Sequence, residues 1–329
     1  MSKIDSQQPT LFPDLQSLTA GLKSVFSRNG SSSDRLVVLD RQSNIHKATF
    51  PNEIVTCQLD DGSEVQLFCK YSAGRDHNVY GHRGGVAYEA AVYRYVLRPS
   101  EATIPAFYGA YTDPTTSQTW LLLEYLDKSV WFAMAPDSAG RNAAARWIGR
   151  FHAINEARLS SVPMPFLNVY DDEYYFGWAR RTLIFARDLD QRFPWLAPLC
   201  ERFEEFIPHL LALPRTVIHG EYYKKNVLFH NETIHPIDWE SAAIALGEID
   251  LATLTDSRRP TEIVRQAELE YQQARWPEGA PPDFEERLTA ARLYMQFRWL
   301  GDRPEWTLDP SALLRFERLR SAGEQLGLI

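Results

Sequence analysis

The sequence predicts an α+β protein in two parts, a small antiparallel β-sheet with one helix followed by a larger, mainly helical part. Two observations lead to this prediction. Up to about residue 126 the chain shows short β-type runs separated by turn signals. After Asp127 apolar residues recur at helical spacing over long stretches, which one β-rich island at 216–240 interrupts. We therefore expect an N-terminal lobe at 35–126 and a helical C-terminal lobe at 127–329.

The N-terminal lobe is expected to follow an extension at residues 1–34. Four apolar residues of that extension recur at helical spacing and indicate a short amphipathic helix, packed on the body or on a partner. They are Leu15, Leu18, Leu22 and Phe26. Residues 60–63 read as a hairpin turn between two strands. Strands are expected at 35–39, 53–59, 64–70 and 119–126, and the helix at 86–97.

The C-terminal lobe is expected to consist largely of helices around the island. These helices are expected at 143–153, 176–193, 197–211 and 283–300. Residues 171–178 mix acidic side chains with aromatic rings. Such a stretch suits a cage for a cation. It also suits a helix start with acids at the N-terminus and rings in the core, which is the interpretation we favour.

Composition restricts the class of protein further. Of the 329 residues, 44% are hydrophobic and 12% aromatic, too many for a disordered chain. The formal charge of −8 and the lack of a long basic run argue against a nucleic-acid partner. No run approaches the ~18 apolar residues of a membrane span, and the N-terminus lacks the apolar core of a signal peptide. Cys57, Cys69 and Cys200 form no metal or redox motif, so we expect a cytoplasmic protein.

The β-rich island reads as a hairpin whose polar turn is centred near Glu232. A hairpin with that centre places Asn226 opposite Asp238, with Cβ atoms roughly 5 Å apart. Mg²⁺ is held by such oxygen ligands together with substrate phosphates, so the pair predicts a partial Mg²⁺ site. Glu221, on the loop that enters the hairpin, can accept a proton from a substrate hydroxyl. The alternative is that Asn226 caps a turn and both acids are solvated.

A second pair of charged residues lies in the N-terminal lobe. Lys70 ends an apolar strand, where a lysine is usually an edge residue. Glu89 faces the apolar stripe of the helix at 86–97, and a carboxylate on a buried face needs a partner. We expect Lys70 to be that partner, which would hold its ammonium group against nucleotide phosphates.

Together these residues resemble the aminoglycoside phosphotransferase and choline kinase family, a branch of the two-lobed protein-kinase-like fold. The strongest part is His219-x-Glu221-x4-Asn226, which is similar to the family's H-x-D-x4-N motif. It is followed by Ile-Asp-Trp-Glu at 237–240, similar to the family's I-D-[WF]-E motif. The resemblance covers roughly residues 35–325.

The resemblance implies an ATP- and Mg²⁺-dependent phosphotransferase that transfers the γ-phosphate to a hydroxyl of a small molecule. It implies that adenine lies against the segment between the two lobes, near residues 124–126, and that Lys70 contacts the α- and β-phosphates. The implied cofactor-binding residues are Lys70, Glu89, Glu124 and Leu126, and the implied catalytic residues are Glu221, Asn226 and Asp238, the last two also as Mg²⁺ ligands. The expected partner is a small hydroxyl substrate, without nucleic acid or membrane, for a monomer or homodimer.

Several residues depart from the family pattern. Glu221 stands where the family has Asp, and a carboxylate displaced by roughly 1 Å can lose about 10²-fold in rate. The alternative function is therefore a pseudokinase, a nucleotide-binding scaffold without turnover. Asp250 is expected to be a structural anchor and His219 to fix the loop by hydrogen bonds, while Glu240 is a further candidate metal ligand.

The phosphate acceptor stays open in the sequence. Antibiotics, amino alcohols, sugars and natural-product intermediates are all compatible with the motifs, as are ATP and GTP. The basic loop at 75–85 is interpreted either as a solvated loop or as a segment that grips phosphate or an anionic substrate.

Overall fold

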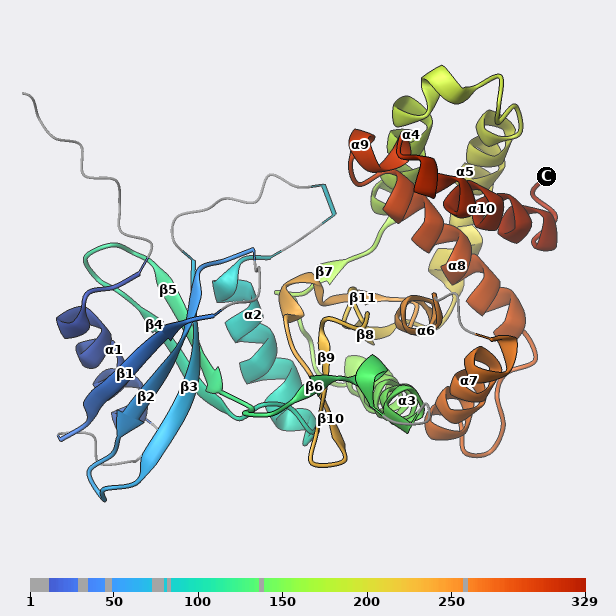
Figure 1. The fold of residues 1–329 in the computed structure, drawn as a ribbon. Helices are drawn as coiled ribbons and strands as arrows, with labels where there is room; N and C mark the ends of the chain where they lie inside the picture. Colours follow the sequence, from blue (N-terminus) through green and yellow to red (C-terminus); the bar gives the residue numbers. More distant parts are fainter. Residues whose placement is uncertain are drawn as a thin grey trace, which may run out of the picture. The chain divides into compact units, whose positions relative to one another are not determined.

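The computed structural model describes residues 12–28, 35–44, 49–72, 80–81, 84–135, 139–256 and 260–329. These residues form two compact units. The first unit holds the described residues up to 72 and those from 84 to 128. The second holds Tyr80, Gly81 and the described residues from 129 onward. Figure 1 shows the elements of both units.

The first unit is built on a five-stranded antiparallel sheet with the strand order β1-β2-β3-β5-β4. Its strands are β1 (Val37–Ser43), β2 (Asn52–Gln58), β3 (Glu64–Tyr71), β4 (Phe107–Thr112) and β5 (Thr119–Glu124). Its helices are α1 (Leu15–Arg28) and α2 (Val86–Val92), and α2 continues through a π-helical turn (Tyr93–Leu97) and a 3₁₀ turn (Arg98–Ser100). The predicted sheet, and the helix expected at 86–97, are thus confirmed.

The helix α1 completes the core of this sheet rather than standing outside it. We expected residues 1–34 to be an extension with a helix packed on the body or on a partner, and its packing on the body is confirmed. Leu18 and Leu22 are fully buried in one apolar cluster with Leu67 of β3 and Trp120 of β5. The two helices cover opposite faces of the sheet (Figure 1). Because side chains alternate along a strand, Lys70 points to the face opposite α1.

The second unit consists of helices and two small sheets. Its helices are α3 (Ala139–Leu159), α4 (Asp172–Phe185), α5 (Leu196–Ala212), α6 (Glu248–Thr255), α7 (Thr261–Arg275), α8 (Phe284–Leu300), α9 (Pro304–Thr307) and α10 (Leu313–Gln325). Its strands are β6 (Val130–Trp131), β7 (Asn168–Val169), β8 (Thr216–Ile218), β9 (Val227–His230), β10 (Thr233–Pro236) and β11 (Ala243–Ala245). The strand orders are β10-β9-β6 and β7-β11-β8.

The helices of this unit pack in pairs around α8, which contacts α4, α6 and α10, while α3 packs along α7. Short 3₁₀ turns lie at Phe132–Met134, Arg187–Leu189, Trp239–Ser241 and Pro310–Ala312. Within the described ranges, no helix is long and apolar enough to cross a membrane.

The start of α4 settles the interpretation of the acidic and aromatic stretch at 171–178. The carboxylate of Asp171 accepts a hydrogen bond from the backbone N–H of Tyr174 (2.9 Å), as an N-cap does. Tyr174, Tyr175 and Trp178 are buried. The favoured helix start is therefore confirmed. The cap also explains why this helix begins at Asp172, earlier than the 176–193 that we expected.

Candidate active site

In the second unit, Asp250 fixes the loop that follows β8. Its carboxylate accepts hydrogen bonds from the backbone N–H groups of His219 (2.6 Å) and Gly220 (2.9 Å). Nδ1 of His219 in turn accepts a hydrogen bond from the backbone N–H of Glu221 (3.3 Å). Nε2 of the same ring lies 2.9 Å from the carbonyl oxygen of Ile237. The predicted roles of Asp250 as an anchor and of His219 as a loop-fixing residue are confirmed.

Gly220 is required by this geometry. Its φ of +80° lies in the left-handed region that glycine adopts readily. A Cβ atom at this position would also lie 2.3 Å from the carbonyl oxygen of Ser241. The loop can therefore approach the segment after β10 closely only because residue 220 has no side chain.

Glu221 is buried, and both Arg298 and Tyr223 bind its carboxylate. Arg298 of α8 donates from Nη2 to Oε1 (2.7 Å) and from Nη1 to the carbonyl of Gly220 (2.8 Å). The Tyr223 hydroxyl donates to Oε2 at 3.2 Å. The carboxylate is thus held by two different side chains on its two oxygens, which fixes the direction in which it points.

Arg298 is a site residue that the sequence analysis did not predict. Burial by itself lowers the pKa of this guanidinium, but the carboxylate of Glu221 and the nearby tyrosines raise it well above its usual range. Arg298 lies in a predicted helix but 77 positions after Glu221. The available signal was an arginine within the apolar stretch 293–300, since a buried guanidinium requires an anionic partner.

The hairpin β9–β10 forms, but with a register one residue away from the prediction. Asn231 and Glu232 both have positive φ (46° and 64°), so they form a two-residue turn and His230 pairs with Thr233. Asn226 then lies opposite Ile237, whose N–H donates to its carbonyl (2.9 Å). The prediction that pairing places Asn226 opposite Asp238 was wrong.

Asp238 is positioned by a different feature. It follows β10 in a left-handed conformation (φ 66°, ψ 58°) that ends the strand and begins the 3₁₀ turn Trp239–Ser241.

The side chain of Asn226 is oriented by a hydrogen bond. Its amide nitrogen donates to the carbonyl of Glu221 (3.1 Å). This hydrogen bond leaves the amide oxygen as the atom of Asn226 with the chemistry of a cation ligand.

The side-chain oxygens of Asn226 and Asp238 are of the kind that ligates Mg²⁺. An amide oxygen and a carboxylate are hard oxygen ligands, and Mg²⁺ in phosphotransferases takes its remaining ligands from water and substrate phosphates. The described part of the chain contains no cluster of three or more His, Cys, Asp or Glu side chains able to hold a metal. Glu240 is buried beside this segment.

The first unit contains the predicted pair of Lys70 and Glu89. Nζ of Lys70 donates to Oε2 of Glu89 at 2.7 Å, and both side chains are buried. The ammonium group also lies 5.4 Å from the centre of the Phe50 ring. The predicted contact between β3 and α2 is thus confirmed, and it holds the ammonium in one place.

Glu124 and Leu126 lie at the end of β5 and just beyond it. The Glu124 carboxylate accepts from the backbone N–H of Ala106 (3.0 Å), so this side chain fastens the start of β4. Leu126 is buried.

Most of the basic loop at 75–85, including Arg75 and Arg83, lies outside the described residues.

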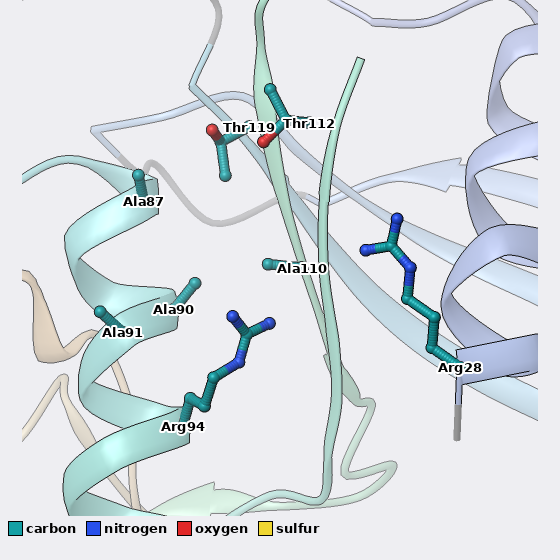
Figure 2. A pocket seen from close by; sticks show the side chains of 8 residues that line it. All are labelled: Arg28, Ala87, Ala90, Ala91, Arg94, Ala110, Thr112 and Thr119. Atoms are coloured by element: carbon teal, nitrogen blue, oxygen red, sulfur yellow. The ribbon is translucent and has the colours of Figure 1, made fainter. Parts of the chain in front are cut away.

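A separate hollow of about 320 Å³ lies in the first unit at the edge strand β4. Figure 2 shows Arg28 and Arg94 directed toward it from either side of Ala110. None of the predicted site residues lines this hollow.

A buried chain of hydrogen bonds supports the loop that carries Glu221. Arg275 donates to the hydroxyl of Tyr271 (2.5 Å), which lies 3.0 Å from Nδ1 of His152. Nε2 of His152 lies 3.1 Å from Asp250. Arg275 also forms an ion pair with Glu248 (3.1 Å). The chain thus connects α7 to the carboxylate that anchors the loop before Glu221.

Known proteins identify the family. Residues 81–287 match the sequence profile of the phosphotransferase enzyme family. Because this match spans more than half of the chain, the protein belongs to that family, and the predicted class of enzyme, a phosphotransferase, is confirmed. No match was found among curated proteins.

Solved structures show the same fold. Choline kinase from Cryptosporidium parvum has a TM-score of 0.61 at 14% identity, covering 96% of this chain and 98% of its own. A putative fructosamine-3-kinase from Haemophilus somnus has a TM-score of 0.56 at 15% identity, covering 93% and 97%. Amicoumacin kinase in complex with AMP-PNP, Ca²⁺ and Ami has a TM-score of 0.55 at 13% identity, covering 87% of each chain. The predicted two-lobed kinase-like fold is thus confirmed.

Proposed function

We propose that the protein is an ATP- and Mg²⁺-dependent phosphotransferase that transfers the γ-phosphate to a hydroxyl group of a small molecule. The observation that carries this proposal is the fixed carboxylate of Glu221, held on an anchored loop five residues before Asn226. A phosphotransferase needs mainly positioning and charge neutralisation, and a fixed carboxylate supplies the orientation of the attacking hydroxyl.

In this proposal Glu221 accepts a hydrogen bond from the acceptor hydroxyl and takes its proton as the oxygen attacks the γ-phosphorus. The bond from that phosphorus to the β–γ bridging oxygen breaks, and ADP leaves. Asn226 and Asp238 would hold Mg²⁺, which neutralises negative charge on the phosphates when bound. The Asn226 side chain keeps its oxygen turned to the cation because its nitrogen is bound to the carbonyl of Glu221.

The nucleotide contacts are proposed for the first unit. Lys70 contacts the α- and β-phosphates, and Glu89 holds it in position at 2.7 Å. The backbone near Glu124 and Leu126 contacts the adenine. The AMP-PNP and Ca²⁺ in the amicoumacin kinase complex support nucleotide and divalent-cation use by this fold.

All three cysteines are buried and form no disulfide, which fits the expected cytoplasmic location.

A second candidate function is a nucleotide-binding module without turnover. The observation that favours it is the same residue, because Glu221 replaces the Asp of the resembled motif and its carboxylate is engaged by Arg298 at 2.7 Å. In that case the protein binds Mg-ATP but transfers no phosphate.

The test combines turnover with binding. Transfer of radiolabelled γ-phosphate is measured against a panel of hydroxyl compounds, with Mg-ATP and Mg-GTP, alongside a thermal-shift assay for nucleotide binding. We expect wild-type turnover, and losses of about 10²-fold or more in Asp238→Ala and Glu221→Gln. Full activity in Asp238→Ala would contradict the assignment. Nucleotide binding without turnover, unchanged in Glu221→Gln, would favour the second candidate.

A further inference from the structure

A cavity of about 810 Å³ lies within the second unit, beside the loop that carries Glu221. This volume falls in the range of about 300–1,000 Å³ typical of small-molecule sites. Four aromatic residues line it, namely Phe132, Tyr223, Trp299 and Trp306. The rings of Trp299 and Trp306 lie 5.8 Å apart. The cavity is therefore large enough for a metabolite-sized ligand and offers ring surface for a flat or apolar part of it.

The charged residues of this cavity are predominantly basic. Arg141, Lys224, Lys225 and Arg315 line it, and Asp256 is the one acidic residue among its described lining residues. The Asp256 carboxylate accepts hydrogen bonds from both Arg315 and Arg318. Two guanidinium groups therefore share one carboxylate, which leaves this corner of the cavity positive.

The four basic side chains are held in different ways. Arg141 is buried, lies 5.4 Å from the Phe132 ring and donates to the carbonyl of Leu254. Arg315 lies over the Trp299 ring at 4.7 Å. Lys224 and Lys225 are exposed at the mouth on the catalytic loop. The cavity thus combines fixed guanidinium groups with two adaptable ammonium groups.

One residue connects the cavity with the proposed catalytic carboxylate. Tyr223 lines the cavity, and its hydroxyl donates to Oε2 of Glu221 at 3.2 Å. The other oxygen of Glu221 is bound to Arg298. Glu221 itself is not among the described lining residues, so Tyr223 is the described residue that joins the cavity to this carboxylate, through Oε2.

We propose that this cavity is the acceptor site and that the acceptor is an anion, a hydroxyl compound that carries an acidic group together with a ring or other apolar part. The inference rests on the proposed function and adds the charge class of the substrate. A cationic amino alcohol or amino sugar would meet positive side chains here, and like charges placed together disfavour binding.

The experiment compares three probes with one scaffold and different charges. Phenyl β-D-glucuronide is anionic, phenyl β-D-glucoside is neutral, and phenyl 2-amino-2-deoxy-β-D-glucoside is cationic. Binding to the full chain is measured by calorimetry without nucleotide. We expect the glucuronide to bind most tightly and to weaken as salt is raised, because its extra affinity is electrostatic. Tightest binding of the amino sugar, or no binding of the glucuronide at millimolar concentration, would overturn the proposal.

Two variants and a control localise the binding. Lys224→Gln/Lys225→Gln should weaken glucuronide binding by about 5-fold and leave the glucoside unchanged, as expected for exposed ion pairs. Trp306→Ala should weaken both probes. Arg187→Gln removes one positive charge from the exposed 3₁₀ turn at Arg187–Leu189 and should change neither. An unchanged glucuronide affinity in the lysine variant would overturn the proposal, as would displacement of the glucuronide by AMP-PNP.

The readouts separate this inference from the proposed function. Probe binding without nucleotide reports on the charge preference of the cavity alone. Phosphate transfer from ATP reports on the function alone. Binding of the glucuronide with no transfer to any hydroxyl compound would refute the proposed function and retain an anion-selective cavity. Transfer confined to cationic acceptors would retain the function and refute the anionic acceptor.

Discussion

The guanidinium of Arg298 and the carboxylate of Glu221 form a buried ion pair with an Nη2–Oε1 distance of 2.7 Å. The same guanidinium donates to the carbonyl of Gly220 at 2.8 Å. Arg298 therefore binds both the side chain of Glu221 and the backbone carbonyl of Gly220. The additional methylene of Glu221, relative to the Asp of the resembled motif, is part of this arrangement because it sets how far the carboxylate reaches toward α8.

Removal of Arg298 should impair both stability and turnover. In Arg298→Met the carboxylate of Glu221 stays buried without its cation, which typically costs about 3–5 kcal/mol. In Arg298→Lys the charge remains but the two-pronged contact with Gly220 and Glu221 is lost. We expect kcat to fall about 10- to 100-fold in Arg298→Lys, with the KM for ATP nearly unchanged, in steady-state kinetics.

A matched control is the ion pair of Arg292 with Glu268, which joins α8, the helix of Arg298, to α7. Arg292→Lys should keep the wild-type kcat. Equal kcat values for Arg298→Lys and Arg292→Lys would contradict a positioning role for Arg298.

Shortening Glu221 should not improve the enzyme. Glu221→Asp restores the residue type of the resembled motif, yet its carboxylate would withdraw from Arg298 by more than 1 Å, since one methylene is lost. We therefore expect kcat to fall by about 10- to 100-fold. The measurement is single-turnover transfer from ATP to the best acceptor found. A higher rate in Glu221→Asp would show that the longer side chain is an impairment.

Loss of the Lys70–Glu89 pair should weaken nucleotide binding. Glu89→Gln leaves the buried ammonium of Lys70 without its anion, so we expect a loss of about 3–5 kcal/mol in stability. Because Lys70 is then no longer held in place, the Kd for Mg-ATP should rise by about 10-fold, which calorimetry can measure.

The pair of Arg41 and Glu53 provides the control for Glu89→Gln. It lies in the same sheet at 2.7 Å, and Glu53 also accepts from Tyr71. Glu53→Gln should lower the melting temperature while the Kd for Mg-ATP stays at the wild-type value. If both variants weaken ATP binding equally, the effect belongs to the stability of the sheet.

The sequence predicted the contacts that local periodicity determines. Lys70 and Glu89 could be paired because Glu89 faces the apolar stripe of its helix, where a carboxylate needs a cation, and Lys70 ends the preceding strand. Asp250 was assigned as an anchor on a different ground, because residues 247–252 resemble a shortened form of the family's G-D-x-x-x-D-L-A segment.

What the sequence could not supply depended on tertiary packing or on a single turn. The helix α1 has the expected spacing, but only the sheet shows that Leu22 fills its core. The turn at Asn231 and Glu232 moved the hairpin register by one residue, because both residues adopt a left-handed conformation. Arg298 and Trp306 are distant in sequence from Glu221, and no local pattern connects them with the catalytic loop.

Replacement of Gly220 should distort the loop that carries Glu221 more than backbone strain alone predicts. Gly220→Ala forces an L-residue to φ +80° and also brings a Cβ to 2.3 Å from the Ser241 carbonyl. Gly62 has a similar φ of +84° with no atom within 4 Å of such a Cβ. We expect Gly62→Ala to cost about 1–2 kcal/mol with full activity. Gly220→Ala should cost more and lose turnover, as measured by urea unfolding and kinetics.

Acid should destabilise the protein through His152. Burial lowers the pKa of this imidazole, while Asp250 opposes the shift. Tyr271, Arg275 and Glu248 are the other groups that act on it or touch it. Arg275 donates to the Tyr271 hydroxyl, so that hydroxyl can donate to Nδ1 of a neutral ring whose Nε2–H faces Asp250. The folded state therefore favours the neutral imidazole.

Because the folded pKa lies below the unfolded value of about 6.5, the unfolded chain binds more protons in this pH range. The contribution of His152 to stability is therefore complete above about pH 6.5 and is lost as the pH falls through the folded pKa. Urea unfolding between pH 5 and 8 should show a steeper acid loss in wild type than in His152→Gln, which can keep both hydrogen bonds without titrating. His209→Gln, at an exposed histidine, should retain the wild-type slope. Identical slopes in wild type and His152→Gln would show that other groups cause the acid sensitivity.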